Sequence, residues 1–314
     1  MEKIQVGISS CLLGYEVRYD GAHKYNSYIE QTLGRFFEFR AFCPEVESGM
    51  SIPRPTIQLR EMSNGIRCVG VKDPGMDVTE QLRSVSMQQY DWLQGLCGYI
   101  LKKDSPSCGM QRVKVYKHEA PIRKGVGIFA EYLQQTFPLL PIEEEGRLGD
   151  AGLRENFIQR VFVFQRWRDL CQQQPLTAHH LMVFHSRHKL IAMSHDQNAA
   201  RELGRLVASV DNGQLELVAQ RYITDLMACL KIVATRKNHV NVLQHIQGYL
   251  KTKLDSDDKQ ELVEVIESYR QNETPLIVPL TLLRHHFRRQ PDAFIDASYY
   301  MQPHPAELAL LNEI

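Results

Sequence analysis

The sequence predicts an α/β protein in which a Rossmann-like parallel sheet domain is followed by an all-α domain. In the first half of the chain, short apolar runs of strand length alternate with helical patterns, which is typical of a doubly wound parallel sheet. In the second half, apolar residues recur at helical spacing and no strand pattern is convincing. Because 314 residues are enough for two hydrophobic cores, we expect one domain over residues 1–146 and another over residues 147–314.

The composition is that of an ordinary globular protein, with 43% apolar and 24% charged residues. No apolar run is long enough to span a bilayer, and the N-terminus lacks the apolar core of a signal peptide. We therefore expect a cytoplasmic protein without a membrane partner. Seven cysteines in a reducing compartment favour metal binding or catalysis over disulfides. The oligomeric state is not predicted.

The first half should contain several strands and helices before the proline- and glycine-rich break at residues 138–149. The expected strands are residues 4–10, 37–43 and 99–103, with a hairpin arm at residues 66–71. The expected helices are residues 26–35, 80–97 and 128–135. The last of these follows Gly125-Val126-Gly127, which could present helix amides to a phosphate, although a tight strand-to-helix turn is the favoured role.

Three cysteines lie at the exits of the predicted strands: Cys11, Cys43 and Cys108, the last within SPSCG at residues 105–109. Parallel strands end at one edge of a sheet, where ligands bind, so the three thiols should meet there. Thiolates suit zinc, copper(I) and iron–sulfur clusters. No close cysteine pair supports a metal site, however, and three small buried side chains remain the alternative. The other cysteines are assigned to the core: Cys68, Cys97, Cys171 and Cys229.

Polar residues beside these cysteines are candidates for catalysis. A metal held by three thiolates keeps an open coordination position, which favours catalysis over electron transfer. Glu45, two residues after Cys43, is a candidate general base for a water, or else a loop-capping carboxylate. Ser105, three residues before Cys108, could relay a proton or simply belong to a turn. Three further loop residues either contact substrate or pair with each other: Arg18, Asp20 and Arg54.

The second half should be a series of helices. They are expected at residues 153–171, 175–193, 196–211, 216–235, 240–250, 257–271 and 276–289, with a short final helix from Pro305. Residues 151–240 hold twelve Lys or Arg against seven Asp or Glu. This excess is compatible with a polyanionic partner, while solvated helix faces are the simpler interpretation.

The motifs SSCLLG, VRYDG, CPE and SPSCG resemble the thiouracil desulfidase family over about residues 1–145. From about residue 147, the segments LRENFIQRVF, FHSRHKLIAMSH and HVNVLQHIQGYLK are similar to an uncharacterised helical domain often fused behind it. The resemblance implies a [4Fe-4S] cluster on Cys11, Cys43 and Cys108, with catalytic roles for Glu45 and Ser105. A single Gly49 after CPE, where the family often has two glycines, puts only the shape of that loop in doubt.

The fused pair of domains resembles bacterial enzymes that remove sulfur from 4-thiouridine in tRNA. We therefore predict a non-redox desulfidase that converts the thiocarbonyl to a carbonyl and releases hydrogen sulfide. The basic residues expected to contact tRNA phosphates are Arg154, Arg160, Arg166, Arg168, Arg187, Lys189, Arg236 and Lys237. One alternative is a desulfidase of free thiouracil or thiolated nucleosides and nucleotides. Another is a metal-containing RNA-binding protein without turnover.

Overall fold

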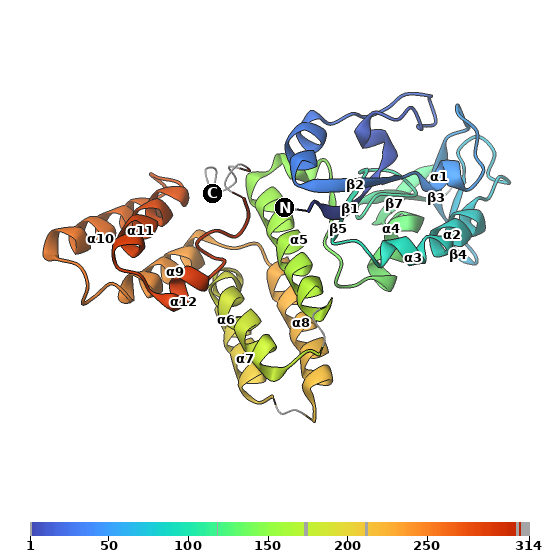
Figure 1. Cartoon of the computed structure of the whole chain (residues 1–314). Helices are drawn as coiled ribbons and strands as arrows, with labels where there is room; N and C mark the ends of the chain where they lie inside the picture. The colour runs from blue at the N-terminus through green and yellow to red at the C-terminus, as the bar shows by residue number, and fades with distance from the viewer. Residues whose placement is uncertain (1, 118, 173–174, 211–212, 306–307, 309–314) are drawn as a thin grey trace. The chain divides into compact units, whose positions relative to one another are not determined.

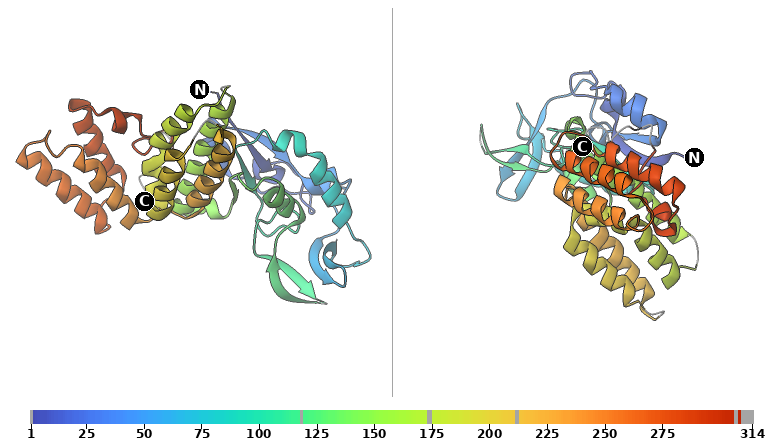
Figure 2. Two further views of the ribbon diagram at one scale, coloured as in Figure 1. Left: turned by 90° about the horizontal axis from the view of Figure 1, so that it is seen from below. Right: turned by 90° about the vertical axis from the view of Figure 1, so that its left-hand side faces the viewer.

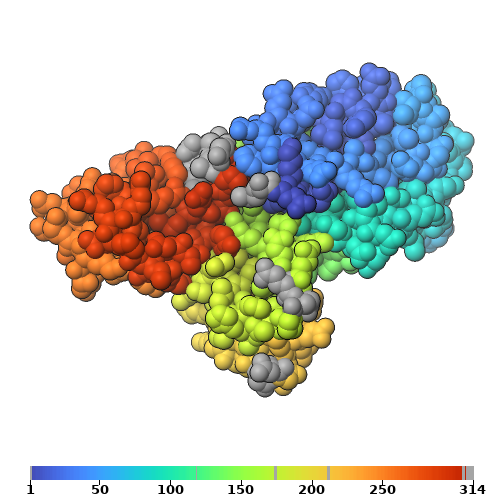
Figure 3. Space-filling model, in the orientation of Figure 1, coloured from blue at the N-terminus to red at the C-terminus, as the bar shows by residue number. Residues whose placement is uncertain are grey.

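The structure, a computed structural model, describes residues 2–117, 119–172, 175–210, 213–305 and 308; the other residues are grey in Figure 3. Contacts within the chain divide it into two compact units, residues 1–149 and residues 150–314. The first unit is α/β and the described part of the second is helical, so the predicted fold class is confirmed (Figure 1).

The first unit is built around a parallel sheet. Its strands are β1 (Ile4–Ser9), β2 (Phe37–Phe42), β5 (Gly98–Leu101) and β8 (Ile142–Glu144), in the order β2-β1-β5-β8. Strand β1 pairs with both β2 and β5, so that Val6 lies opposite Phe39 on one side and Gly98 on the other. Val6 and Ile8 are fully buried, as expected for a central strand of a parallel sheet.

Strand β8 lies inside the segment that the sequence analysis treats as a break between domains. It pairs in parallel with β5, placing Ile142 opposite Tyr99, and all three of its residues are buried. Interpreting residues 138–149 as a connection alone was therefore wrong. The two acidic residues of β8 hide its strand character, because acidic side chains are rare at buried strand positions.

A second sheet combines two antiparallel hairpins. Its strands are β3 (Ile57–Met62), β4 (Gly65–Gly70), β6 (Val113–Lys117) and β7 (Ala120–Gly125), in the order β4-β3-β6-β7. The hairpin arm expected at residues 66–71 corresponds to β4. Strands β6 and β7 were not predicted. Every residue of β7 except Gly125 is exposed, and the basic, proline-containing sequence of this strand lacks an apolar face.

The helical segments of the first unit are short. They are η1 (Ser10–Leu13), η2 (Tyr28–Thr32), η3 (Leu33–Arg35), α1 (Pro44–Glu47), α2 (Thr79–Gln88), α3 (Tyr90–Leu93), α4 (Ile128–Thr136) and η4 (Arg147–Gly149). The helix expected over residues 80–97 is wrong in its extent, because it is interrupted at Gln89 and the amide of Cys97 already bonds to the carbonyl of Gln5 on β1. The helix expected over residues 26–35 is a π-helical turn followed by a 3-10 turn.

The described part of the second unit contains eight helices. They are α5 (Ala151–Gln172), α6 (Ala178–His195), α7 (Gln197–Ala208), α8 (Leu215–Lys231), α9 (Arg236–Gly248), α10 (Ser256–Arg270), α11 (Ile277–Arg289) and α12 (Ala293–Ala297). The first seven match the expected helices within a few residues, whereas α12 was not expected. Trp167 of α5 packs against Phe184 and Tyr222, which places part of the core between α5, α6 and α8. Most of the final helix expected from Pro305 lies outside the described residues.

Candidate active site

A cavity of about 430 Å³ lies where β1, β2 and β5 end. Residues that follow each of these strands line it, including Cys11, Cys43 and Cys108. The chain passes from β1 to β2 on one side of β1 and later crosses back to form β5 on the other side, and such a switch point leaves a crevice at the carboxyl ends of the strands. The structure therefore brings the three predicted thiols to one site.

The three thiols are largely buried and influence one another. Cys11 follows β1 within η1, Cys43 precedes the first residue of α1, and Cys108 lies in the turn after β5. Burial, followed by the nearby Cys43, raises the pKa of Cys11 to about 11. The same two causes raise the pKa of Cys108, and burial raises that of Cys43. Thiols in this setting lose their protons readily only when a metal replaces them.

The spacing of the sulfurs bears on the kind of metal group that fits. Tetrahedral zinc with Zn–S bonds of about 2.3 Å would place its sulfur ligands about 3.8 Å apart. Among the described residues, however, the three thiols do not form a set of ligand atoms that all lie within 4.8 Å of one another. A single zinc ion would therefore require the thiols to move closer together, whereas a group with several metal atoms bridges ligands that lie farther apart.

The turn that carries Cys108 is held by hydrogen bonds of its own. The hydroxyl of Ser105 accepts hydrogen bonds from the amides of Ser107 at 3.2 Å and Cys108 at 3.1 Å. The amide of Gly109 donates to the carbonyl of Ser105 at 2.8 Å. Ser105 thus shapes the turn in addition to facing the cavity.

The N-terminus of α4 closes on the same turn. The amides of Gly127, Ile128 and Phe129 donate to the carbonyls of Gly109, Pro106 and Ser107, respectively, at 2.8, 3.1 and 2.9 Å. These amides are therefore used within the fold. The segment 125–127 forms the strand-to-helix turn that the sequence analysis favoured over a phosphate site.

Glu45, on α1, is held from two sides. Its Oε2 accepts hydrogen bonds from Nε and Nη2 of Arg54 at 2.9 and 2.6 Å. Its Oε1 accepts one from the hydroxyl of Ser107 at 2.6 Å, with the hydroxyl of Ser105 at 3.5 Å. Arg54 also donates to the carbonyl of Val17 at 2.8 Å, and its side chain is only 3% exposed. The carboxylate therefore has a fixed orientation in which Oε1 faces the serines.

The other two polar candidates form a pair with each other. Arg18 and Asp20 are 3.2 Å apart, and the hydrogen bond from Arg18 lowers the pKa of Asp20. Arg18 lines the cavity, whereas Asp20 is exposed and is not part of the lining. Arg18 thus pairs with Asp20 and Arg54 pairs with Glu45, while both arginines also line the cavity.

Two features of the site were not foreseen from the sequence. Ser107 is closer to Glu45 than Ser105 is, although both serines lie in the same five-residue motif. Lys102, directly after β5, forms an ion pair with Glu145, and the amide of Lys103 donates to that carboxylate at 2.8 Å. The position of Ser107 directly before the predicted ligand Cys108 was a signal that could have identified it. The pairing of Lys102 could not be predicted, because Glu145 follows the unrecognised strand β8.

Comparison with known proteins places this site in a family. A family model described as 2-thiouracil desulfurase matches residues 6–145, which contain the three cysteines and Glu45. An uncharacterized protein of Escherichia coli strain K12, YbgA, is 34% identical over 152 residues, which are 48% of this chain and 89% of the relative. An uncharacterized protein of Bacillus subtilis strain 168, YbbK, is 30% identical over 136 residues, 41% of this chain and 89% of the relative. The chain belongs to the 2-thiouracil desulfurase family.

The rest of this 2-thiouracil desulfurase family member also has a match. A model described as a protein of unknown function (DUF1722) covers residues 189–305, within the helical unit. Among solved structures, the chain is similar to a [4Fe-4S]-dependent thiouracil desulfidase, TudS, with 30% identity and a TM-score of 0.38. That match covers 48% of this chain and 94% of the other. The family resemblance stated from the cysteine motifs is confirmed.

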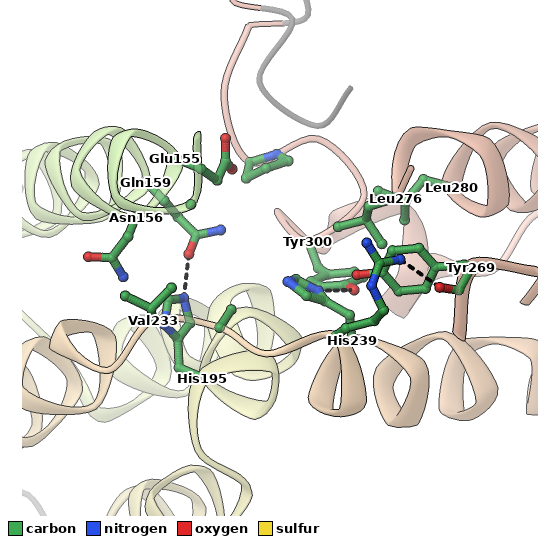
Figure 4. Close-up of a pocket in the computed structure, with 14 residues that line it drawn as sticks. Glu155, Asn156, Gln159, His195, Val233, His239, Tyr269, Leu276, Leu280 and Tyr300 are labelled. Atoms are coloured by element: carbon green, nitrogen blue, oxygen red, sulfur yellow. Dashed lines mark hydrogen bonds between the residues drawn. The ribbon is translucent and has the colours of Figure 1, made fainter. Parts of the chain in front are cut away.

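The helical unit contains a separate, smaller cavity of about 160 Å³ (Figure 4). Polar side chains line it but are largely bonded to one another: Gln159 to His195 at 2.5 Å, and His239 to Tyr300 at 2.8 Å. Arg236 donates to the carbonyl of Tyr269 at 2.6 Å. These bonds connect α5, α6, α9, α10 and the segment after α12, so they contribute to packing within the unit.

Three of the basic residues expected to contact phosphates are used inside the helical unit. Arg160 is buried, and Arg236 bonds to the carbonyl of Tyr269. Arg166 donates to the carbonyl of Pro303 at 2.5 Å, and burial lowers its pKa to about 10. Arg187 and Lys237 are exposed.

Within the described ranges, none of the helices combines the length and hydropathy that a membrane span requires.

Proposed function

We propose that this chain is a desulfidase that replaces the thiocarbonyl sulfur of a thiolated pyrimidine with oxygen. The observation that carries the proposal is the meeting of three thiols, two of them buried, and an oriented carboxylate in one cavity. Cys11, Cys43 and Cys108, which line this cavity together, would hold a [4Fe-4S] cluster. When bound, the cluster supplies a soft Lewis acid for which sulfur is a preferred ligand.

The protein residues account for the remaining chemistry. Oε1 of Glu45 takes a proton from a water, whose oxygen attacks the carbon of the thiocarbonyl. The C–S bond breaks as the carbonyl forms, and sulfur leaves with two protons as hydrogen sulfide. One water is consumed for each sulfide released, so the overall reaction requires no electron donor or acceptor. Arg54 holds Glu45 in place, and the hydroxyl of Ser107 lies where it can pass the proton from the carboxylate.

For the substrate, we propose 4-thiouridine in tRNA. The helical unit with its exposed cations, such as Arg187 and Lys237, supports a polyanionic substrate, because a free base needs no such partner. The second candidate is free thiouracil or a thiolated nucleoside or nucleotide. The internal use of Arg160, Arg166 and Arg236 favours it, and so does a cavity of about 430 Å³, which suits a small ligand.

The test is anaerobic purification followed by measurement of iron, acid-labile sulfide and turnover. We expect a brown protein that releases sulfide from a thiolated pyrimidine and retains its iron, but little activity, after Glu45→Gln. Cys108→Ala should lose both cluster and activity. A chain that stays inactive and colourless after reconstitution would support the non-catalytic alternative. The 4-thiouridine content of tRNA, measured after incubation with the enzyme, separates the two substrate candidates.

A further inference from the structure

Helices α10 and α11 bring together three side chains of the kinds that bind metal ions. Asp258 and Glu261 are three residues apart on α10 and therefore share one face of the helix. Helix α11 packs beside α10 and carries His286 (Figures 1 and 2). Each of the three residues offers one ligand atom, and these atoms all lie within 4.8 Å of one another.

The burial of His286 is an independent indication of a missing ligand. The residue is 3% exposed, and its Nε2 is buried without a hydrogen-bond partner among the described residues. Buried polar atoms in native proteins nearly always have a partner, because leaving one unpaired costs its full desolvation energy. The imidazole lies instead beside two carboxylates, one partly buried and one exposed.

We propose that Asp258, Glu261 and His286 bind a divalent transition metal ion of the zinc type, with water completing the coordination. Zinc bonds to carboxylate oxygen and imidazole nitrogen of about 2.1 Å place tetrahedral ligands about 3.4 Å apart. The present spacing closes to that value by small movements, for which the exposed side chain of Glu261 has room.

The ligand set decides the class of ion. Two carboxylates balance a charge of two, and imidazole suits zinc and its neighbours in the first transition row. Calcium prefers six to eight oxygen ligands, and magnesium keeps an almost complete oxygen shell. This site shares no residue with the cysteine cavity and lies in the other unit. Because its ligands come from α10 and α11, the role of the ion is to join these two helices.

The test uses Co²⁺ and Zn²⁺ titration of the full-length protein. Thiolate-bound Co²⁺ gives intense charge-transfer absorption, whereas a carboxylate–imidazole site gives only weak d–d bands, so the two sites are distinguishable in one sample. We expect one equivalent of Co²⁺ to bind with the weak bands, and Zn²⁺ to displace it. Addition of Zn²⁺ should also raise the Tm. Asp258→Asn/Glu261→Gln should lose this equivalent and the Tm rise.

The single variants refine the test. Replacing an outer partner of a metal ligand already weakens binding by about 10–100-fold, so His286→Gln should weaken it by at least about tenfold. The matched controls are His285→Gln, the exposed neighbour on α11, and Glu264→Gln on α10, which should both bind as the unmodified chain does. A wild-type chain without the weak bands, or an unchanged stoichiometry in Asp258→Asn/Glu261→Gln, would overturn the proposal.

Discussion

Glu45 has chemically different partners on its two carboxylate oxygens. Oε2 is occupied by Nε and Nη2 of Arg54, while Oε1 accepts from the hydroxyl of Ser107 at 2.6 Å. An oriented carboxylate with one oxygen near a mobile proton is the arrangement that a general base requires. The hydroxyls of Ser105 and Ser107 are 2.9 Å apart. The roles of the two serines can therefore be distinguished only by the other hydrogen bonds that each one makes.

We expect Ser107→Ala and Ser105→Ala to have different effects. Ser107→Ala removes the short bond to Glu45, and hydrogen bonds to charged groups contribute about 1.5–3 kcal/mol, so kcat should fall by about 10–100-fold with the iron content unchanged. Ser105→Ala removes the acceptor of two amides in the turn of Cys108, so the iron content should fall. Iron per chain and kcat, measured on the same preparations, check both. Normal turnover in Ser107→Ala would contradict a role in proton transfer.

At this scale, the sequence indicated Cys11, Cys43, Cys108 and Glu45, because each follows a strand whose direction the apolar pattern reveals. It did not indicate that Arg54 holds Glu45 or that Ser107 is nearer to Glu45 than Ser105 is. These contacts depend on a loop that returns to the cavity and on the path of one turn. Side-chain distances of a few tenths of an ångström are not encoded in residue type or spacing.

At the scale of elements, the site depends on the contact between α4 and the turn of Cys108. The first amides of a helix have no partner within it, and here carbonyls of the turn accept from them. A Cβ added at Gly127 would lie 2.6 Å from the carbonyl carbon and oxygen of Ser107 and 2.9 Å from the amide nitrogen of Cys108. Only glycine permits this approach of two backbones.

We therefore expect Gly127→Ala to damage the cluster site while leaving the helical unit folded. The new methyl group must push the turn away from α4, which moves Cys108 relative to the other thiols. Iron content and activity should fall several-fold, because one of three ligands is displaced. Gly149→Ala is the control, since a Cβ there would meet nothing within 4 Å. Full iron content in Gly127→Ala would show that the turn can shift without consequence.

The elements that the sequence missed explain where pattern reasoning fails. Helices α5 to α11 were predicted well, because capping residues and apolar stripes mark many of them; Asp255, for example, accepts hydrogen bonds from the amides of Asp257 and Asp258. Strands β7 and β8 were missed for opposite reasons. The former is exposed and basic, and the latter buries two glutamates whose cost is offset by local bonds, such as that from Arg147 to Glu143 at 2.6 Å.

At the scale of the whole molecule, the stability of the helical unit should depend on pH. His188 and His239 lie in the helical unit, and burial lowers the pKa of each to about 3. Above the ordinary histidine pKa of about 6.5, both side chains are neutral in the folded and unfolded chains, so they do not make the stability depend on pH. Below it, the unfolded chain binds protons that the folded chain does not, so stability is lost as the pH falls from about 6.5 toward about 3.

We expect the free energy of unfolding of the helical unit to fall by up to about 4 kcal/mol between pH 7 and pH 5 from these two residues. Trp167 reports on this unit, since its ring centroid is 5.2 Å from that of Phe184, and Trp92→Phe removes the other tryptophan. Urea unfolding of that variant, followed by fluorescence, gives the pH dependence. His188→Leu should make the dependence less steep, because only His239 of the pair remains, and His285→Gln, at an exposed position, should leave it unchanged. Equal slopes in all three proteins would contradict burial as the cause.

The second question at this scale is whether the helical unit contributes to substrate binding. Binding of a polyanion by Arg and Lys side chains releases counterions, so its affinity falls linearly with salt on logarithmic axes. A neutral nucleoside releases none. If tRNA is the substrate, kcat/KM for thiolated tRNA should fall steeply between about 50 and 200 mM salt, while kcat/KM for free 4-thiouridine should change little.

Charge reversal on the helical unit then tests whether particular residues contact the phosphates or whether only the net charge of the unit matters. Arg187→Glu and Lys237→Glu should each lower kcat/KM for thiolated tRNA and reduce its salt slope by about 1, because one phosphate contact is lost. Neither change should alter turnover of 4-thiouridine, since both residues lie outside the cysteine cavity. Lys251→Glu, at an exposed position between α9 and α10, is the charge-matched control. If both substrates show the same flat salt dependence, the helical unit does not bind the substrate through phosphates, and the small-molecule activity becomes the better proposal.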